Sequence, residues 1–207
     1  MLALQGGVRE HVAALQANGV QPVPVRRPAD LAGLEGIVLP GGESTTIGKL
    51  LGIFGLLEPL REALAEGLPA YGSCAGMILL ADRLTDPATD LSGNPQPTLG
   101  GLDILVRRNA FGRQRDSFEA DLHFKGIAGL PSSAGLEQPD TLRAVFIRAP
   151  LVEKTGADVQ VLAEVPGPVA RIVAVRSGQL LATSFHPEVT GDIRFHERFL
   201  ARVVSVA

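Results

Sequence analysis

The sequence is poor in cysteine, in aromatic side chains and in clusters of basic residues, and each shortage excludes a class of protein. Cys74 is the only cysteine among 207 residues, so no disulfide can form within the chain, and a reducing compartment is expected. Aromatic residues make up 4% of the chain and basic residues never run beyond two, which argues against a nucleic-acid-binding surface. No apolar run is long enough to cross a membrane, and Met1 begins no charged-then-apolar leader. We therefore expect a cytoplasmic protein that binds neither nucleic acid nor a membrane.

The pattern of apolar residues indicates the fold class. A chain of 207 residues is long enough for one domain with a substantial core, which we expect to span residues 1–207. Its first third alternates short apolar segments with segments of helical spacing, and its second half is rich in strands and turns. This pattern predicts a three-layer α/β fold with an open, mixed and mostly parallel sheet covered by helices on both faces. Strands are expected near residues 1–4, 21–25, 36–39, 102–106, 118–124, 143–147, 159–165, 169–176 and 179–185.

Cys74 lies in a distinctive setting, midway between Gly72 and Gly76. A short apolar segment precedes this triplet and good helix formers follow it, which indicates a strand, a tight turn with the thiol at its apex, and a helix. Such a turn needs glycines because its backbone is strained and neighbouring segments pack closely. A helix N-terminus also favours the thiolate form of a cysteine. A lone cysteine is more often a small buried apolar residue, so the catalytic interpretation requires a partner base.

His186 is the candidate base, and Glu188 is the candidate group that orients it. Pro187 restricts His186 to extended backbone angles, which fixes the direction in which its side chain leaves the strand. Glu188 follows two residues later, on the same side of an extended segment, so its carboxylate can hold one ring nitrogen while the other faces a sulfur. A half-buried histidine beside a solvated glutamate is the alternative. Together with the Cys74 turn, the pattern favours a Cys74–His186–Glu188 catalytic triad.

The segment Pro40-Gly41-Gly42-Glu43-Ser44 is a candidate oxyanion site, because it follows a buried strand and can present bare backbone N–H groups. We expect Gly42 to supply one donor and Ala75, directly after the nucleophile, to supply the second. A plain glycine turn and a phosphate cradle are the alternatives, and the lysine of a nucleotide-binding loop is missing. We expect no cofactor and no metal, since the sequence shows no metal-ligand spacing.

These motifs give the chain a resemblance to the triad glutamine amidotransferases, which share the Gly-x-Cys-x-Gly turn, the Pro-Gly-Gly loop and a distal His-Pro-Glu. Two further stretches, Arg-Asn-Ala-Phe-Gly-Arg-Gln at 108–114 and Phe-Ile-Arg-Ala-Pro at 146–150, resemble one branch of that family, the glutaminase subunits of pyridoxal phosphate synthase. The matching segments span nearly the whole chain. The resemblance implies a class I glutamine amidotransferase fold and hydrolysis of L-glutamine to L-glutamate and ammonia through a cysteine thioester. It also implies delivery of the ammonia to a synthase subunit for pyridoxal phosphate (vitamin B6) biosynthesis.

The resemblance assigns roles to residues that would otherwise be read as ordinary surface groups. An arginine is suited to a free amino acid, because its planar guanidinium can pair with an α-carboxylate. The residues expected to contact glutamine are Gly42, Glu43, Ser44, Arg108, Ile147 and Arg148.

Five more residues are placed less directly. Asn109, Arg113 and Gln114 are expected near the site or at the partner surface. Glu10 and His11 fall in the first predicted helix, where we expect them at the partner interface, with a solvated helix face as the alternative.

Two alternative functions stay open at the level of sequence. One is a glutaminase that serves another acceptor, such as imidazole glycerol phosphate or a purine intermediate, and the two branch-specific stretches argue against it. The other is a non-catalytic regulatory module on the same fold. The complete set of Cys74, His186 and Glu188 argues against this second alternative, because a binding module needs none of the three for chemistry.

Overall fold

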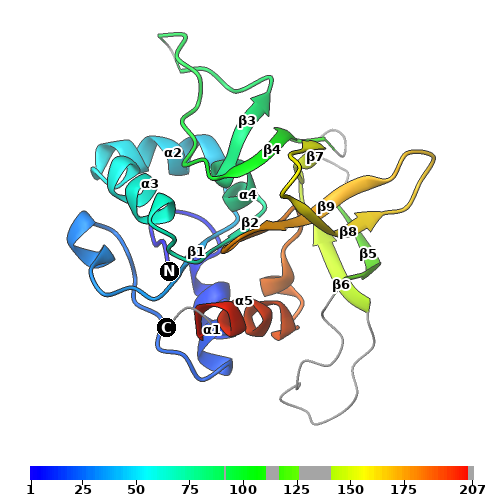
Figure 1. The fold of residues 1–207 in the computed structure, drawn as a ribbon, viewed down its shortest axis with the longest axis horizontal. Coiled ribbons are helices and arrows are strands. Elements are labelled where there is room, and N and C mark those ends of the chain that lie inside the picture. Colours follow the sequence, from blue (N-terminus) through cyan, green and yellow to red (C-terminus); the bar gives the residue numbers. More distant parts are fainter. Residues whose placement is uncertain (91, 111–116, 126–140, 205–207) are drawn as a thin grey trace.

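The computed structural model describes residues 1–90, 92–110, 117–125 and 141–204, and these residues form a curved sheet with helices on both faces (Figure 1). The predicted three-layer α/β arrangement is thereby confirmed. Within these residues, no helix combines the length and apolar character needed to cross a membrane. One face of the sheet carries α2 (Ser44–Ile53), α3 (Leu57–Ala65) and α4 (Ala75–Leu80), and the other carries α1 (Val8–Ala17) and α5 (Arg194–Val204).

The main sheet has eight strands in the order β1-β2-β10-β9-β7-β4-β3, with β8 pairing to β9. Strands β5 and β6 form a separate antiparallel hairpin. The strand bounds are β1 Ile37–Leu39, β2 Ala70–Ser73, β3 Ala81–Thr85, β4 Leu102–Arg107, β5 Phe118–His123, β6 Thr141–Phe146, β7 Leu151–Thr155, β8 Gln160–Val165, β9 Arg171–Ser177 and β10 Leu180–Thr183. Short 3-10 helices span Pro28–Leu31 and Pro187–Val189.

The predicted mixed sheet is confirmed, but its antiparallel share is larger than the sequence suggested. Parallel pairing joins β1, β2 and β10 and also joins β3 to β4, whereas β9 pairs antiparallel with β7, β8 and β10, and β4 pairs antiparallel with β7. For the pairs β8–β9 and β9–β10, the reason is that the connecting segments are too short to hold the crossover helix that a parallel pair requires. The hairpin between β9 and β10 turns on Gly178 and Gln179, whereas the strands expected near 169–176 and 179–185 place the turn one residue earlier.

The first two predicted strands are reduced to a single bridge. Leu2 pairs with Val25, and the backbone N–H of Leu2 donates to the carbonyl of Val38 on β1. Pro22 and Pro24 have no N–H to donate, so the ladder cannot extend around Val25.

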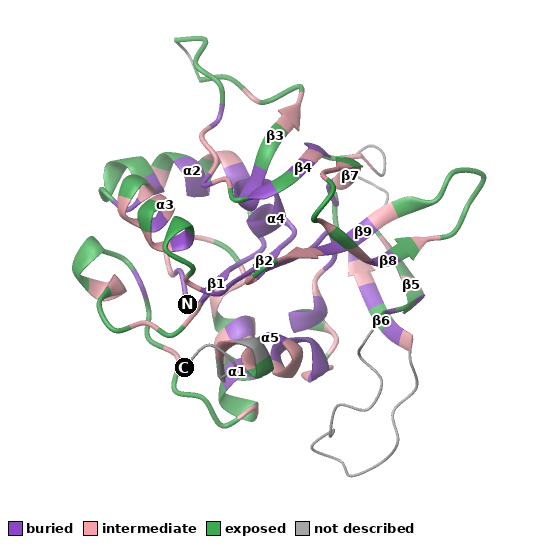
Figure 2. Ribbon diagram, in the orientation of Figure 1, coloured by how far each residue is buried: buried purple, intermediate pink, exposed green. Residues whose placement is uncertain are grey.

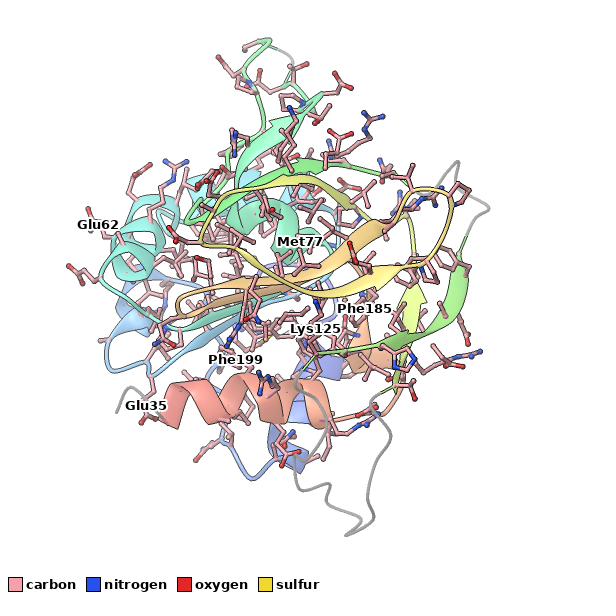
Figure 3. All side chains as sticks on the ribbon, turned by 45° about the vertical axis from the view of Figure 1, so that its right-hand side comes forward. Glu35, Glu62, Met77, Lys125, Phe185 and Phe199 are labelled. Carbon is pink, nitrogen blue, oxygen red and sulfur yellow. The ribbon has the colours of Figure 1, made fainter. Side chains whose placement is uncertain are left out.

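Two apolar layers hold the sheet between its helices, and alternation along β1 shows how they form. Ile37 and Leu39 point into the layer beneath α2, α3 and α4, whereas Val38 between them points into the layer that packs on α1 and α5. Met77 and Phe199 lie on opposite sides of the sheet in the same way (Figure 3). Figure 2 shows the buried residues following β1 and β2 through the middle of the molecule.

The carboxyl ends of β1, β2 and β10 meet at one edge of the sheet because these three strands are parallel neighbours. Leu39 therefore delivers the glycine loop, Ser73 delivers Cys74, and Thr183 leads toward His186. Segments that are far apart in the sequence converge at this edge, which is where open α/β sheets place their ligands.

Candidate active site

Cys74 occupies a strained turn between β2 and α4. Its backbone angles are φ 47° and ψ −98°, a region that residues with a side chain rarely adopt. The flanking glycines are required by close packing: a Cβ on Gly76 would lie 2.3 Å from the carbonyl oxygen of Leu39, and one on Gly72 would lie 2.5 Å from the carbonyl carbon of Gly76. The predicted strand–turn–helix and its explanation for the two glycines are confirmed.

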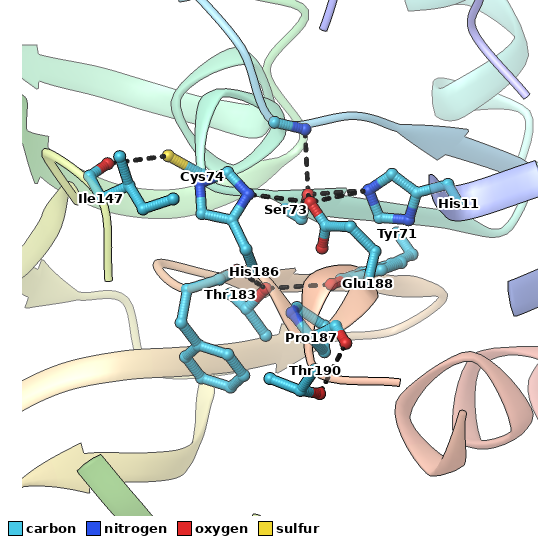
Figure 4. A network of polar contacts seen from close by, with 12 residues as sticks. His11, Tyr71, Ser73, Cys74, Ile147, Thr183, His186, Pro187, Glu188 and Thr190 are labelled. Atoms are coloured by element: carbon cyan, nitrogen blue, oxygen red, sulfur yellow. Dashed lines mark hydrogen bonds and ion pairs between the residues drawn. The ribbon is translucent and has the colours of Figure 1, made fainter. Parts of the chain in front are cut away.

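His186 and Glu188 lie beside this turn, as the sequence suggested. The Nδ1 atom of His186 is 2.8 Å from the Oε1 atom of Glu188 (Figure 4), and the imidazole lies close enough to Cys74 for the thiol to raise its pKa. Gly41 makes room for the imidazole, because a Cβ there would lie 2.3 Å from Cε1 of His186 and 3.5 Å from Cβ of Cys74. The structure thus brings the thiol, the base and the carboxylate together in the order that a relay of protons requires.

The charges of this group support one another. Burial lowers the pKa of His186, but hydrogen bonds to Cys74 and Glu188 outweigh it and raise the pKa from 6.5 to about 10. Burial raises the pKa of Glu188, but hydrogen bonds from His11 and His186 prevail and hold it well below its usual value. An ionised Glu188 beside a protonated imidazole is therefore the favoured state near neutral pH.

The two predicted oxyanion donors lie on either side of Cys74. Among the described residues, no hydrogen bond engages the backbone N–H of Gly42 or of Ala75, whereas the N–H of Cys74 donates to the carbonyl of Thr183 at 2.7 Å. The next amide in the glycine loop, that of Glu43, donates to Oε1 of Gln5 at 3.0 Å. The free amides are the ones that a tetrahedral intermediate could use.

A pocket lies on the open side of Cys74, and we call it the outer pocket. The side chains leave about 30 Å³ of open space there, enough to hold a water molecule. All six residues predicted to contact glutamine line it, together with the thiol. The outer pocket is lined by Gly42, Glu43, Ser44, Cys74, Ile78, Arg108, Asn109, Ile147 and Arg148.

An ion pair crosses the outer pocket. Nη2 of Arg108 lies 3.1 Å from Oε1 of Glu43, while the buried Nε of Arg108 has no hydrogen-bond partner among the described residues. Arg148 and Asn109 both have left-handed backbones, each with φ 47°. Of the four non-glycine residues with positive φ in the described chain, three therefore line this pocket, and such strain is typical of ligand sites.

Behind the triad lie three buried polar side chains, His11, Ser73 and His196, whose contacts with one another and with Glu188 the sequence did not reveal, and we call these four residues the inner network. Nε2 of His11 is 3.0 Å from Oγ of Ser73 and 3.4 Å from Oε1 of Glu188. Nδ1 of His11 is 2.8 Å from Nε2 of His196. These residues come from α1, β2, the segment after β10, and α5 (Figure 4 shows all but His196 labelled).

His11 requires a correction. We predicted it at the partner interface or on a solvated helix face, but its side chain is fully buried against the triad. The signal was present in the spacing of α1, because His11 falls three residues after Val8 and four before Leu15, on the face that packs inward. Glu10 is only partly buried, and its carboxylate pairs with the exposed Arg9 at 3.3 Å.

Three further expectations have different outcomes. Asn109 lies at the site as expected, whereas Arg113 and Gln114 fall outside the described residues, as does the segment 126–140. Within the described ranges, no three His, Cys, Asp or Glu side chains are grouped so that they could hold a metal ion.

Comparison with known proteins agrees with this geometry. A family model described as the SNO glutamine amidotransferase family matches residues 1–205. The pyridoxal 5'-phosphate synthase subunit PdxT of Paenarthrobacter aurescens is 60% identical, covering 98% of this chain and 90% of the relative. The protein of the same name from Rhodococcus opacus is 58% identical over 100% of this chain and 96% of its own length.

A solved structure is also similar. A protein described as a glutamine amidotransferase superposes with a TM-score of 0.83 at 42% identity, covering 98% of this chain and 96% of the other. More distant structures, such as PurLQS from Thermotoga maritima at 18% identity and a TM-score of 0.63, share the fold. From the family match and the close relatives together, the chain belongs to the SNO glutamine amidotransferase family.

Proposed function

We propose that the protein hydrolyses L-glutamine to L-glutamate and ammonia, and that it supplies the ammonia to a synthase subunit that makes pyridoxal 5'-phosphate. The observation that carries the chemistry is that Cys74 lines the outer pocket and has His186, paired with Glu188, beside it. The partner and the product are inferred from the relatives, whose names describe them as subunits of pyridoxal 5'-phosphate synthase.

The first half of the reaction forms a thioester. The Cys74 thiolate attacks the side-chain amide carbon of glutamine, and the N–H groups of Gly42 and Ala75 hold the resulting oxyanion. The His186 imidazolium then gives its proton to the leaving nitrogen, so that ammonia departs and a γ-glutamyl thioester remains on Cys74. Glu188 keeps the proton of Nδ1 in place, which aims the other ring nitrogen at the reacting atoms.

The second half releases glutamate. His186, neutral after its first proton transfer, takes a proton from water, and the hydroxide attacks the thioester carbon at the same oxyanion site. Collapse of the second tetrahedral intermediate expels the Cys74 thiolate and leaves His186 protonated, which restores the starting state. Every proton transfer is assigned to His186, so the scheme requires no cofactor.

The outer pocket supplies groups for both charges of the amino acid. Arg108 is suited to the α-carboxylate, because its buried Nε has no other partner among the described residues. Glu43 is suited to the α-ammonium group once the ion pair with Arg108 opens. Ser44, Ile147 and Arg148 complete the wall.

The remaining proposals concern the setting of the enzyme. We place the whole activity in one glutamine amidotransferase domain spanning residues 1–207, and we place the protein in the cytoplasm, where its single cysteine stays reduced. Docking of the synthase subunit protects the ammonia, because free ammonia is protonated in bulk water. The two alternatives are the delivery of ammonia to another acceptor and a regulatory module without activity. No observation in the structure favours either alternative.

Substitution of the nucleophile tests the proposal. Cys74→Ala is expected to lower ammonia release from glutamine by at least about 10⁴-fold, measured with the synthase subunit present, while the melting temperature stays close to that of the wild type. Comparing wild-type rates with and without the synthase subunit shows whether docking completes the oxyanion site. Substantial ammonia release by the Cys74→Ala variant would exclude the mechanism.

A further inference from the structure

The inner network contains three polar side chains that the proposed mechanism does not use. His11, Ser73 and His196 are fully buried, and a buried polar group costs free energy unless hydrogen bonds replace its water. They come from α1, β2 and α5, so the fold brings them together from distant parts of the sequence. Their contacts lead, step by step, to the carboxylate of the triad.

A single unpartnered atom assigns the protons of the two histidines. Nδ1 of His196 is buried and has no hydrogen-bond partner among the described residues. An unpaired lone pair in such a place is less costly than an unpaired N–H, so the proton of His196 lies on Nε2. His196 therefore donates to Nδ1 of His11 across 2.8 Å. This leaves Nε2 of His11 as the atom that carries a proton toward the triad.

The proton on Nε2 of His11 lies closest to Oγ of Ser73, at 3.0 Å, and Oε1 of Glu188, the oxygen that orients the base, is the next acceptor. Oε1 of Glu188 lies 3.4 Å from Nε2 of His11 and 2.8 Å from Nδ1 of His186, whereas Oε2 of Glu188 has no hydrogen-bond partner among the described residues. The direction of the carboxylate therefore depends on donors that converge on one oxygen. The ring of Tyr71 closes the space beside them, with its centroid 5.9 Å from that of His11 and 5.8 Å from that of His196.

Ser73 connects this oxygen to the glycine loop. Its Oγ accepts a hydrogen bond from the N–H of Gly41 at 2.9 Å, and its hydroxyl lies 3.4 Å from Oε1 of Glu188. The peptide of Gly41 is followed by Gly42, the proposed oxyanion donor. One hydroxyl group thus contacts both the segment that binds the oxyanion and the carboxylate that orients the base.

We propose that His11 and Ser73 are positioning residues for glutamine hydrolysis: His11 fixes the direction of the Glu188 carboxylate, and Ser73 ties that carboxylate to the oxyanion loop. This inference rests on the proposed glutaminase activity. Both residues act through Glu188 and Gly41, and neither contacts the substrate. Loss of either one lowers turnover and leaves the outer pocket, and hence glutamine binding, in place.

The test compares two substitutions of His11 in the full chain with its synthase partner. His11→Leu removes the donor, and kcat for ammonia release is expected to fall about 10- to 100-fold with KM within about threefold of the wild type. His11→Gln keeps an N–H near the position of Nε2, and it is expected to recover most of the lost kcat. The acid limb of the kcat profile is expected to move to higher pH in His11→Leu, because Glu188 loses a donor that lowers its pKa.

Ser73→Ala provides an independent test, because it removes only a hydroxyl group. Its kcat is expected to fall about tenfold, and the double variant with His11→Leu is expected to lose less than the product of the two single losses, because both act on one carboxylate. Leu60→Ala on α3 is the control for stability alone: it lowers the melting temperature and leaves kcat and the acid limb unchanged.

The outcomes separate this inference from the proposed function. A wild-type protein that releases no ammonia with its partner present overturns the proposed function. An active wild type with unchanged kcat in His11→Leu or in Ser73→Ala overturns the inference. Failure of His11→Gln to recover activity also overturns it. If His11→Leu does not fold, the Ser73→Ala and His11→Gln variants decide the question by the same criteria.

Discussion

The two sides of Cys74 are built in contrasting ways. The inner network is buried, comes mainly from helices and strands, and is held by hydrogen bonds of 2.8 to 3.4 Å. The outer pocket comes mostly from loops, and Ile147 in its wall is 42% exposed. The fold thus fixes the side where protons move and leaves the side that meets the substrate free to open. Turnover and binding should therefore respond to different substitutions.

The backbone shows the same contrast. Cys74, Asn109 and Arg148, which have strained φ angles, all line the outer pocket. The inner network has no strained backbone among its four residues, because regular elements and the short helix Pro187–Val189 hold them. Strain of this kind persists only where the surrounding structure over-determines it, so its position marks the part of the site where the fold holds an unfavourable backbone in place.

In this comparison, the largest effect on kcat is expected from a substitution in the inner network. Glu188→Gln is expected to lower kcat about 10²- to 10⁴-fold, because an amide can donate to Nδ1 of His186 and so favour the wrong tautomer. KM should stay within about threefold, since Glu188 does not line the outer pocket. Steady-state ammonia release gives both constants. An equal loss in kcat and in binding would show that the two sides are not separate.

A substitution in the outer pocket should instead change KM more than kcat. Arg108→Gln is expected to raise KM for glutamine about 10- to 100-fold with a smaller change in kcat, because it removes charge-assisted hydrogen bonds to the α-carboxylate. Arg108→Lys keeps the charge but loses the planar fork, so it should lie between the wild type and Arg108→Gln. A fall in kcat with no change in KM would contradict the assignment of Arg108 to binding.

A smaller effect concerns how stability depends on pH, and it tests the burial of His196 in the inner network. Burial and the neighbouring His11 lower the pKa of His196 from 6.5 to about 3. The unfolded chain binds a proton at this histidine below pH 6.5 while the folded protein does not until about pH 3, so this group makes the free energy of unfolding fall as the pH drops. Between pH 6.5 and 5, the free energy of unfolding of His196→Phe should fall by about 2 kcal/mol less than that of the wild type.

Urea unfolding at both pH values measures this effect, with His123→Gln as the matched control. His123 is exposed on β5, and its substitution should leave the pH dependence unchanged. A His196→Phe variant with the same acid sensitivity as the wild type would show that His196 is not buried in its neutral form.

Much of the fold and the site could be predicted from the sequence because the signals are local. The turn at Cys74 and the segment after His186 carry their chemistry within a few residues, and the apolar spacing of α1, α2 and α3 is strong. Strands β3 and β7 were not predicted. Ala81–Thr85 follows α4 with no turn residue between them, and Leu151–Thr155 carries two charged residues in five positions.

The inner network could not be predicted for a different reason. His11 and Ser73 are separated by 62 residues, and His11 and His196 by 185. No local pattern reports a contact between positions so far apart, and it forms only once α1 and α5 pack on the same face of the sheet. The spacing of α1 indicated that His11 faces inward, but only the assembled fold shows which groups it meets there.

The most direct test of the central claim is to trap the γ-glutamyl group on the enzyme. The full chain with its synthase partner is mixed with glutamine, quenched in acid during turnover, and mapped by peptide mass spectrometry. We expect a mass increase of one γ-glutamyl group on the peptide that contains Cys74, and none in the Cys74→Ala variant. Steady ammonia release, with an unmodified Cys74 peptide or with the group on another residue, would contradict the account.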